Sequence, residues 1–262
     1  MISLIISIYK RLDFLDILLQ GVARQSYRNF EVIVAEDDNA EETIRFLKDA
    51  QSRYEFPIRH VSQEDNGFRK TKILNAALNI SKGEQIVFFD GDCIPHKHCL
   101  KEYAKAIDKN KLCYGRRACL SEAYTARLLE EKKIKNLNFL KALFAASDSM
   151  KHGFYLPFEL GFSKQHREIL GCNWGVLREH IFAVNGFDED YTHACIGEDI
   201  DIGKRLKSSG LRMKSMKNRA IVYHLYHPAT HPESDNNEMT ILLTAKMQEG
   251  SIACRNGLYK RE

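Results

Sequence analysis

The first 95 residues alternate between short apolar segments and longer amphipathic ones, and this order limits the fold more than any other feature of the sequence. Between the apolar segments, apolar residues recur at helical spacing, as Leu15, Leu18 and Val22 do. Alternating strands and helices predict an α/β fold whose central sheet is mostly parallel, with helices on both faces and right-handed crossovers. The apolar segments suit buried strands and span residues 2–8, 30–35, 57–61 and 85–89.

Polar and acidic residues follow each predicted strand. In a parallel sheet these strand ends lie along one edge, where they can converge on a single ligand. After the second strand, Asn39 is the predicted N-cap of a helix that runs to about Tyr54. The polar segments are Tyr9-Lys10-Arg11, Asp37-Asp38, Glu64-Asp65 and Asp90-Gly91-Asp92.

The fourth strand ends in two carboxylates, Asp90 and Asp92, separated by a glycine. Carboxylates at a strand end form an oxygen-rich site that suits Mn²⁺ or Mg²⁺. Gly91 would let a ligand approach the backbone. An Asp-Gly-Asp tripeptide is also an ordinary turn, so it does not establish a metal site by itself.

After Asp92 the regular alternation of predicted strands and helices ends. We expect a helix over residues 98–108, a short strand over 112–115 and a Lys-, Leu- and Ala-rich helical segment over 121–149. The basic face of that last segment is either solvated or rests on an anionic membrane as an interfacial helix. Residues 152–165 are rich in aromatic side chains and predict a loop that packs in the core or lines a pocket.

The single tryptophan, Trp174, is flanked by the glycines Gly171 and Gly175. The glycines predict tight backbone and an accessible indole ring. Such a ring can hold the apolar face of a sugar, and ordinary core packing is the alternative.

Three carboxylates, Glu198, Asp199 and Asp201, open a predicted helix. Acidic residues suit the first turn because the helix dipole favours their charged form. A carboxylate in this position can also act as a general base that takes the proton of an attacking hydroxyl.

A last strand over residues 220–223 ends at His224, and His227 follows. Imidazoles can join carboxylates around Mn²⁺, and a solvated histidine-rich loop is the alternative. Because side chains three residues apart in a strand point to opposite faces, we expect at most one of the two histidines to bind metal. Residues 235–248 predict a surface helix, and residues 255–262 predict a frayed tail.

Composition narrows the functional classes. A length of 262 residues allows one large α/β domain or two small ones. The net charge of +4 is mild, and no basic cluster with interleaved aromatic residues indicates nucleic-acid binding. Seven cysteines without a CxxC pair argue against zinc and for reduced thiols in a cytoplasmic protein. Without a signal peptide or a membrane-spanning run, we expect a soluble protein, or one that is peripheral at the inner membrane.

Six motifs recur in a recognisable order: Ser7-Ile8-Tyr9-Lys10-Arg11, Glu36-Asp37-Asp38-Asn39, Asn66-Gly67-Phe68-Arg69-Lys70, Asp90-Gly91-Asp92, Gly197-Glu198-Asp199 and His224. Over roughly residues 1–230 the chain resembles the family 2 glycosyltransferases. From Asn173-Trp174-Gly175 through Glu198-Asp199 it is similar to the C-terminal half of galactosyl- and N-acetylgalactosaminyltransferases, including chondroitin-polymerase-like domains. The resemblance implies the GT-A fold, which is Rossmann-like.

The resemblance implies a role for each matching residue. Asp92 and His224 are expected to hold Mn²⁺ or Mg²⁺, with His227 as a rival for His224. Asp199 is expected to deprotonate the acceptor hydroxyl, with Glu198 binding the acceptor or steadying the base, and Asp201 is a rival base if the helix begins later. The residues expected to bind the nucleotide sugar are Ser7, Tyr9, Asp38, Arg69, Asp90, Gly91 and Trp174, the last as a wall of the sugar site.

The resemblance also implies a reaction. An inverting transferase would move a hexose or N-acetylhexosamine from a UDP-sugar to a hydroxyl of a saccharide or lipid-linked saccharide, in surface polysaccharide synthesis. Because the chain lacks the membrane helices of processive synthases, transfer of one sugar is favoured. The polar segment from His227 to Asn237 is expected to close over the site and exclude water.

Residues 1–95 are expected to be the nucleotide-sugar-binding half of one domain, residues 96–232 the acceptor-binding and catalytic half, and residues 233–262 a C-terminal helix and tail. Two alternatives stay open. A nucleotidyltransferase that makes NDP-sugars is disfavoured because the loop after the first strand has no glycine to cradle a triphosphate. A non-catalytic nucleotide- or sugar-binding module would not need Asp-Gly-Asp, Glu-Asp and His224 together.

Overall fold

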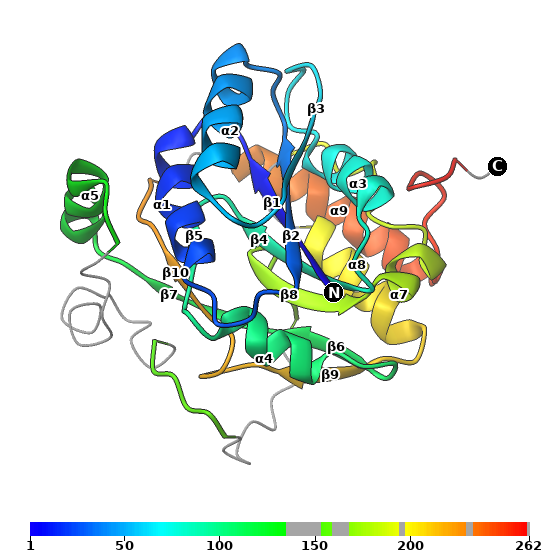
Figure 1. The fold of residues 1–262 in the computed structure, drawn as a ribbon. Coiled ribbons are helices and arrows are strands. Elements are labelled where there is room, and N and C mark those ends of the chain that lie inside the picture. Colours follow the sequence, from blue (N-terminus) through cyan, green and yellow to red (C-terminus); the bar gives the residue numbers. More distant parts are fainter. Residues whose placement is uncertain (135–152, 159–167, 194–196, 229–232, 261–262) are drawn as a thin grey trace.

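The computed structural model describes residues 1–134, 153–158, 168–193, 197–228 and 233–260. Within these residues, seven strands form the central sheet in the order β3-β2-β1-β4-β8-β6-β9 (Figure 1). β1 to β4 pair in parallel, as predicted. The strands are β1 (Ile2–Ile8), β2 (Phe30–Glu36), β3 (Ile58–Ser62), β4 (Gln85–Asp90), β6 (Lys111–Tyr114), β8 (Asn173–Leu177) and β9 (Arg212–Ser215).

Helices cover both faces of this sheet, and alternate residues of β1 show how. Leu4 and Ile6 face a core shared with α1, α2 and α4, whereas Ile5 faces a core shared with α3, α7 and α8. Both sides of the strand are buried because the crossover helices of a parallel sheet cover both of its faces. These helices are α1 (Leu12–Ala23), α2 (Glu41–Arg53), α3 (Lys70–Ile80), α4 (Cys99–Ala106), α7 (Arg178–Ala183) and α8 (Glu198–Ser208).

A second sheet brings a late strand to the end of β4. β10 pairs antiparallel with β5, and His224 lies opposite Cys93. Because Cys93 directly follows Asp92, this register sets His224 beside the Asp-Gly-Asp segment. In the described residues the sheet has three strands, β5 (Cys93–Pro95), β10 (Ile221–His224) and β7 (Arg116–Cys119), and α5 (Glu122–Glu131) packs on it.

The structure adds a strand that the sequence pattern does not predict, at Trp174. β8 lies antiparallel between β4 and β6, and Trp174 is opposite both Phe88 and Tyr114. A Cβ atom at Gly175 would lie 2.8 Å from the carbonyl oxygen of Ile86. The glycine therefore permits the close approach of β4, and it does not mark a turn.

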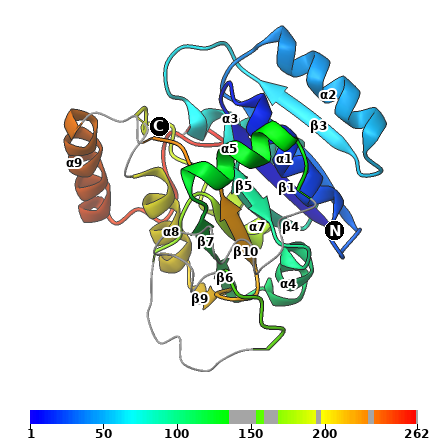
Figure 2. The same cartoon turned by 90° about the vertical axis from the view of Figure 1, so that its left-hand side faces the viewer.

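The C-terminal segment is anchored, so the predicted frayed tail is wrong for residues 255–260. The helix α9 (Glu233–Glu249) packs beside α8 (Figure 2). Beyond it, the N–H of Leu258 donates to the carbonyl oxygen of Asn185, and the N–H of Tyr259 donates to Asn185 Oδ1 over 2.9 Å. The Asn185 amide donates to the carbonyl oxygens of Cys254 and Tyr259. One asparagine thus satisfies several backbone groups of the tail.

Asn39 is not the N-cap of α2, which corrects the prediction. Ala40 precedes the helix, and Asn39 Oδ1 instead accepts a hydrogen bond from the Ser62 hydroxyl over 2.9 Å. The strand end of β3 thus competes with the helix for this side chain.

Three predicted segments are described only in part. The helix α5 ends at Glu131, and residues 135–149 of the predicted basic helix lie outside the described residues. Residues 159–165 of the predicted aromatic loop and residues 229–232 of the predicted closing segment also lie outside them. Among the helices of the described ranges, none combines the length and the apolar character needed to cross a membrane.

Candidate active site

The ends of β1 and β4 meet at Asp90. Ser7 lies opposite Asp90 in the parallel pair, and the Ser7 hydroxyl donates to Asp90 Oδ1 over 2.9 Å. The N–H of Gly91 donates to the Ser7 carbonyl oxygen over 2.8 Å. A Cβ atom at Gly91 would lie 2.8 Å from Ile8 Cγ2, so the glycine lets β1 come close. Approach of a ligand at Gly91 stays a prediction.

Asp92 lies in a cluster of three side chains whose chemistry suits a divalent cation. Asp92 Oδ2 is 3.2 Å from His224 Nε2 and 3.1 Å from His227 Nε2. One ligand atom of each residue lies within 4.8 Å of the others. A carboxylate oxygen with two imidazole nitrogens suits Mn²⁺. Burial favours the neutral acid, but hydrogen bonds from both histidines hold the pKa of Asp92 well below its ordinary value.

The expectation that His224 and His227 point to opposite faces is wrong. His224 is the last residue of β10, and the N–H of Leu225 donates to the Asp92 carbonyl oxygen over 2.9 Å. The chain then leaves the strand, so strand alternation no longer decides where His227 points. Both imidazoles reach the same oxygen of Asp92, and their ring centroids are 5.2 Å apart.

The first turn of α8 fixes Asp199 through the backbone. The N–H of Gly171 donates to Asp199 Oδ2 over 2.9 Å, and the N–H of Ile200 donates to Oδ1 over 2.8 Å. Each carboxylate oxygen therefore has a donor that sets its direction. Burial raises the pKa of Asp199 above its ordinary value, and burial raises the pKa of the neighbouring Glu198 to about 7.

Asp201, the rival base, is occupied by an internal ion pair. Arg205 Nε and Nη2 donate to Asp201 Oδ2 over 2.8 and 2.6 Å, and the two side chains are only 6% and 7% exposed. Arg205 Nη1 also donates to the carbonyl oxygens of Val184 and Gly186. Asp201 therefore pairs with the arginine that ties α8 to the end of α7, while Asp199 lines a cavity.

Lys70 is a site residue that the sequence reasoning misses. Its Nζ lies 2.7 Å from Asp90 Oδ1 and 3.7 Å from Glu198 Oε1. Burial opposes the charge, yet the surrounding carboxylates raise the pKa of Lys70 above its ordinary value, so the side chain is a cation. The one signal in the sequence is its place directly after Arg69, at the start of a helix.

The accessible ring predicted for Trp174 is wrong. Trp174 is 0% exposed, and its ring stacks on Phe88 with centroids 4.4 Å apart. Phe187 meets the Phe88 ring edge-on. Trp174 is thus a buried wall and not an open platform. The small cavity that these aromatic rings help to line is also lined by Ser7, Lys70, Gly171, Glu198 and Asp199.

Tyr9, Asp38 and Arg69 lie at the same edge of the sheet and make contacts of their own. Tyr9 is 51% exposed, and its hydroxyl donates to Asp65 Oδ2 over 3.2 Å. Asp38 Oδ1 accepts from the N–H of the next residue, and Arg69 Nη2 donates to the carbonyl oxygen of Glu64. Their expected contacts with a nucleotide stay predictions.

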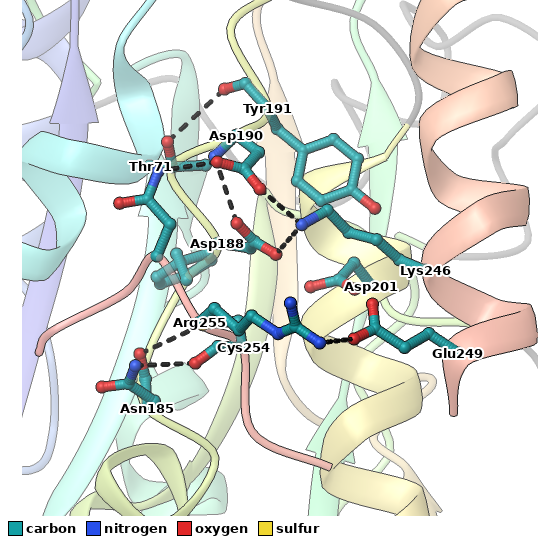
Figure 3. A network of polar contacts seen from close by, with 12 residues as sticks. Thr71, Asn185, Asp188, Asp190, Tyr191, Asp201, Lys246, Glu249, Cys254 and Arg255 are labelled. Carbon is teal, nitrogen blue, oxygen red and sulfur yellow. Dashed lines mark hydrogen bonds and ion pairs between the residues drawn. The ribbon is translucent and has the colours of Figure 1, made fainter. Parts of the chain in front are cut away.

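The loop before α8 is fixed from the C-terminal helix (Figure 3). Lys246 Nζ on α9 lies 2.6 Å from Asp188 Oδ2 and 2.6 Å from Asp190 Oδ2. The side-chain amide of Asn256 donates to Asp190 Oδ1 over 2.7 Å. One lysine and one tail residue therefore hold two neighbouring carboxylates of this loop.

The next residue of the loop, Tyr191, touches the start of two helices. A Cβ atom at Gly197, the residue before α8, would lie 2.5 Å from the Tyr191 ring. On the other side, the Thr71 hydroxyl donates to the Tyr191 carbonyl oxygen over 3.5 Å (Figure 3). Thr71 directly follows Lys70, and Gly197 directly precedes Glu198. Tyr191 therefore contacts the residue next to Lys70 and the residue next to Glu198.

The sheet is mostly parallel, has acidic strand ends and holds an antiparallel β8 between β4 and β6, and comparison with known proteins gives the class and family to which such a chain belongs. The sequence model of glycosyl transferase family 2 matches residues 3–168. A second model, described as the N-terminal domain of galactosyltransferase, matches residues 157–228. The chain belongs to glycosyl transferase family 2, and the resemblance noted in its motifs is confirmed.

Solved structures confirm the predicted GT-A fold. The mannosyltransferase PcManGT from Pyrobaculum calidifontis, in complex with GDP-Man and Mn²⁺, is similar with a TM-score of 0.63 and 16% identity, over 95% of this chain and 64% of that one. Residues 1–349 of TarS from S. aureus, in complex with UDP-GlcNAc, give a TM-score of 0.64 and 17% identity, over 94% of this chain and 66% of that one.

Curated relatives are glycosyltransferases that are longer than this chain. A hyaluronan synthase from Pasteurella multocida is 25% identical over 250 residues, which cover 89% of this chain and 25% of the synthase. A validoxylamine A glucosyltransferase from Streptomyces hygroscopicus is 25% identical over 230 residues, which cover 81% of this chain and 53% of that enzyme. The chain thus spans a quarter of the first relative and about half of the second.

Proposed function

We propose that the protein is a metal-dependent inverting glycosyltransferase that moves a hexose or N-acetylhexosamine from a UDP-sugar to a hydroxyl of a saccharide or lipid-linked saccharide. The observation that carries the proposal is that Lys70 bridges Asp90 at the end of β4 to Glu198 at the start of α8. Asp90 lies two residues before Asp92, the proposed metal ligand, and Glu198 lies directly before Asp199, the proposed base. Two similar solved structures hold GDP-Man and UDP-GlcNAc, which supports a nucleotide-sugar donor, and the second supports a UDP-sugar. The relation to a hyaluronan synthase supports polysaccharide synthesis.

Asp92, His224 and His227 are the residues that would hold the metal ion. Their donor set of one carboxylate and two imidazoles fits Mn²⁺ better than Mg²⁺, which prefers oxygen ligands. A divalent ion bound there supplies a Lewis acid that neutralises the charge of the leaving UDP. Asp90, held by Ser7, would contact the ribose side of the donor.

Asp199 would act as the general base. It takes the proton of the acceptor hydroxyl while the acceptor oxygen bonds to the anomeric carbon and UDP leaves with the bonding electron pair. A single displacement inverts the anomeric configuration, so an α-linked donor gives a β-glycoside. The backbone donors of Gly171 and Ile200 keep the carboxylate in one direction, and Glu198 would bind the acceptor or steady the base.

We also propose the nucleotide-binding residues, the division into two halves and the location that the sequence predicts. The nucleotide would contact Ser7, Tyr9, Asp38 and Arg69, with Trp174 as a buried wall behind the sugar. Residues 1–95 would be the donor half, residues 96–232 the acceptor half and residues 233–262 the C-terminal helix and tail. A cytoplasmic location with peripheral contact at the inner membrane would place the enzyme next to a lipid-linked acceptor.

Release of UDP from a panel of UDP-sugars, with and without Mn²⁺, tests the proposal. The wild-type chain should split one donor slowly in a metal-dependent reaction, and Asp92→Ala should lose this activity. Asp199→Asn should bind UDP normally and retain part of the hydrolysis, since its proton transfer belongs to the acceptor step. Asp49→Ala, at an exposed carboxylate on α2, is the matched control and should behave as wild type.

One combined result would contradict the proposal. If no donor is split and calorimetry finds no Mn²⁺-dependent UDP binding, the transferase assignment fails. Binding of a sugar or nucleotide without metal would then point to the non-catalytic binding module.

A further inference from the structure

Lys70 joins two parts of the chain that the proposed reaction uses separately. Its side chain is 19% exposed and lies at the first residue of α3. The ammonium makes a short ion pair with Asp90 on β4 and faces Glu198 on α8, 3.7 Å away. Asp90 belongs to the donor side of the proposed site, and Glu198 belongs to the acceptor side.

Asp199 lies close to the same ammonium through Gly171. A Cβ atom built at Gly171 would be 3.3 Å from Lys70 Nζ and 3.8 Å from Asp199 Oδ2. The absence of a side chain at Gly171 therefore leaves the ammonium and the proposed base on either side of one small space. Lys70, Glu198 and Asp199 line the same cavity, and Asp90 pairs with Lys70.

The charges around this space are unbalanced. Three carboxylates from β4 and α8, namely Asp90, Glu198 and Asp199, face one ammonium, and the buried Tyr191 hydroxyl is a further titratable group near Glu198. Like charges held this close in a buried site cannot all stay ionised without a cation among them. An ammonium has three protons to donate, and the pair with Asp90 uses one of them.

We propose that Lys70 is a positioning residue that holds Asp90 and Glu198 in register across the donor–acceptor boundary and whose positive charge keeps Asp199 able to accept a proton. The inference rests on the proposed transferase function for its catalytic meaning. Its electrostatic part concerns residues that the fold already brings together, so it can be tested without turnover.

Removing the charge of Lys70 should make both carboxyl groups of α8 weaker acids. Lys70 lowers the pKa of Glu198 and of Asp199 against the opposite effect of burial. Without it, Glu198 stays protonated at a higher pH, and the fraction of Asp199 that is ionised falls at neutral pH. A shift of one pH unit means that about tenfold less base is ionised on the acid side of the profile.

Carboxyl titration by ¹³C NMR on protein labelled at Glu and Asp side chains measures this directly, with Glu198→Gln and Asp199→Asn used to assign the signals. Lys70→Gln, which can still donate to Asp90, and Lys70→Met should each raise the titration midpoint of Glu198 by about one unit or more. Lys70→Arg should keep the midpoint near that of wild type. Lys72→Met is the matched control, because Lys72 is an exposed residue on the same helix.

The pH profile of sugar transfer gives the catalytic readout. In Lys70→Gln the acid limb of kcat should move to higher pH by the same amount as the NMR midpoint of Asp199, the proposed base, while a loss of folded protein alone would lower kcat equally at every pH. An unchanged Glu198 midpoint in a folded Lys70→Gln or Lys70→Met variant would overturn the proposal. So would failure of both neutral variants to fold, which would assign Lys70 to the fold itself.

The failure of this inference can be told apart from the failure of the proposed function. If the wild-type chain splits no UDP-sugar, the transferase assignment fails, but the NMR midpoints still decide whether Lys70 governs the carboxylates. If the wild-type chain is active and the midpoints do not move, the transferase stands and the role of Lys70 falls.

Discussion

Replacing Asp201 and Asp199 by asparagine, one at a time, should separate a structural carboxylate from a catalytic one. Asp201→Asn removes the negative charge that faces Arg205 in a pair of side chains only 6% and 7% exposed. Breaking a buried ion pair costs about 3–5 kcal/mol, and the lower end applies because the asparagine oxygen can still accept one hydrogen bond. At about 2–4 °C per kcal/mol for a chain of this size, a loss of about 3 kcal/mol lowers the melting temperature by about 6–12 °C.

Circular dichroism during heating and sugar transfer per folded molecule are the two measurements. Asp201→Asn should melt early and, once corrected for unfolded protein, should transfer sugar at nearly the wild-type rate. Asp199→Asn should keep most of its stability, since one oxygen can still accept from Gly171 or Ile200, and should lose transfer. A stable Asp201→Asn variant that transfers no sugar would refute the reasoning and make Asp201 the base.

Three further predictions concern the same elements. The pKa of Glu198 is about 7 in the folded chain and 4.5 ordinarily, so the folded state binds more protons between these values and Glu198 should make the free energy of unfolding fall as pH rises through this window; in urea unfolding, this fall should be steeper in wild type than in Glu198→Gln. Deleting residues 255–262 should cost about 1–3 kcal/mol, because the buried Asn185 side chain loses both of its hydrogen bonds with the Tyr259 backbone, and a melting temperature equal to that of the full chain would show that the tail is not anchored. Trp174→Ala should cost about 3–5 kcal/mol in chemical denaturation, because it empties a fully buried site, whereas an open sugar platform would lose little stability.

The first half of the fold was predictable because its signals are local. The helix over Lys70–Ile80 and the strand ending at Asp90 follow from hydrophobic spacing within each segment, and their parallel pairing follows from the alternation of strands and helices. The start of α8 at Glu198 was likewise predictable, since three acidic residues at the beginning of an apolar periodic segment mark a first turn.

The burial of Trp174 depends on residues distant in the chain and could not be predicted. Its two flanking glycines, taken alone, indicate tight backbone and an accessible ring. In the structure Gly175 makes room for β4, and Phe88 and Phe187 close over the indole ring. Each partner comes from another element, so the choice between a core residue and a ligand platform was not present in the local pattern.

The positions of His227 and of the C-terminal tail also depend on polar contacts with distant residues, which the local sequence pattern does not show. Strand alternation applies within β10 up to His224, but the chain then leaves the strand and His227 reaches Asp92. The tail looks polar and terminal, and it is ordered because Asn185 faces its backbone. A rule that is correct inside a strand thus fails within three residues of its end, where contacts between elements decide the direction of a side chain.

Lys70 shows that a sequence motif can indicate which residues form a site but not which charges surround each of them. From the motif alone, Arg69 attracts attention because a guanidinium suits a nucleotide phosphate, and its neighbour looks like an ordinary helix lysine. The fold reverses this order. It buries the ammonium between carboxylates of β4 and α8, while the Arg69 side chain donates to a nearby backbone carbonyl. With the proposed roles of Asp90 and Asp199, Lys70 would partly set the proton affinity of Asp199, so donor binding and the strength of the base would be linked through a single cation.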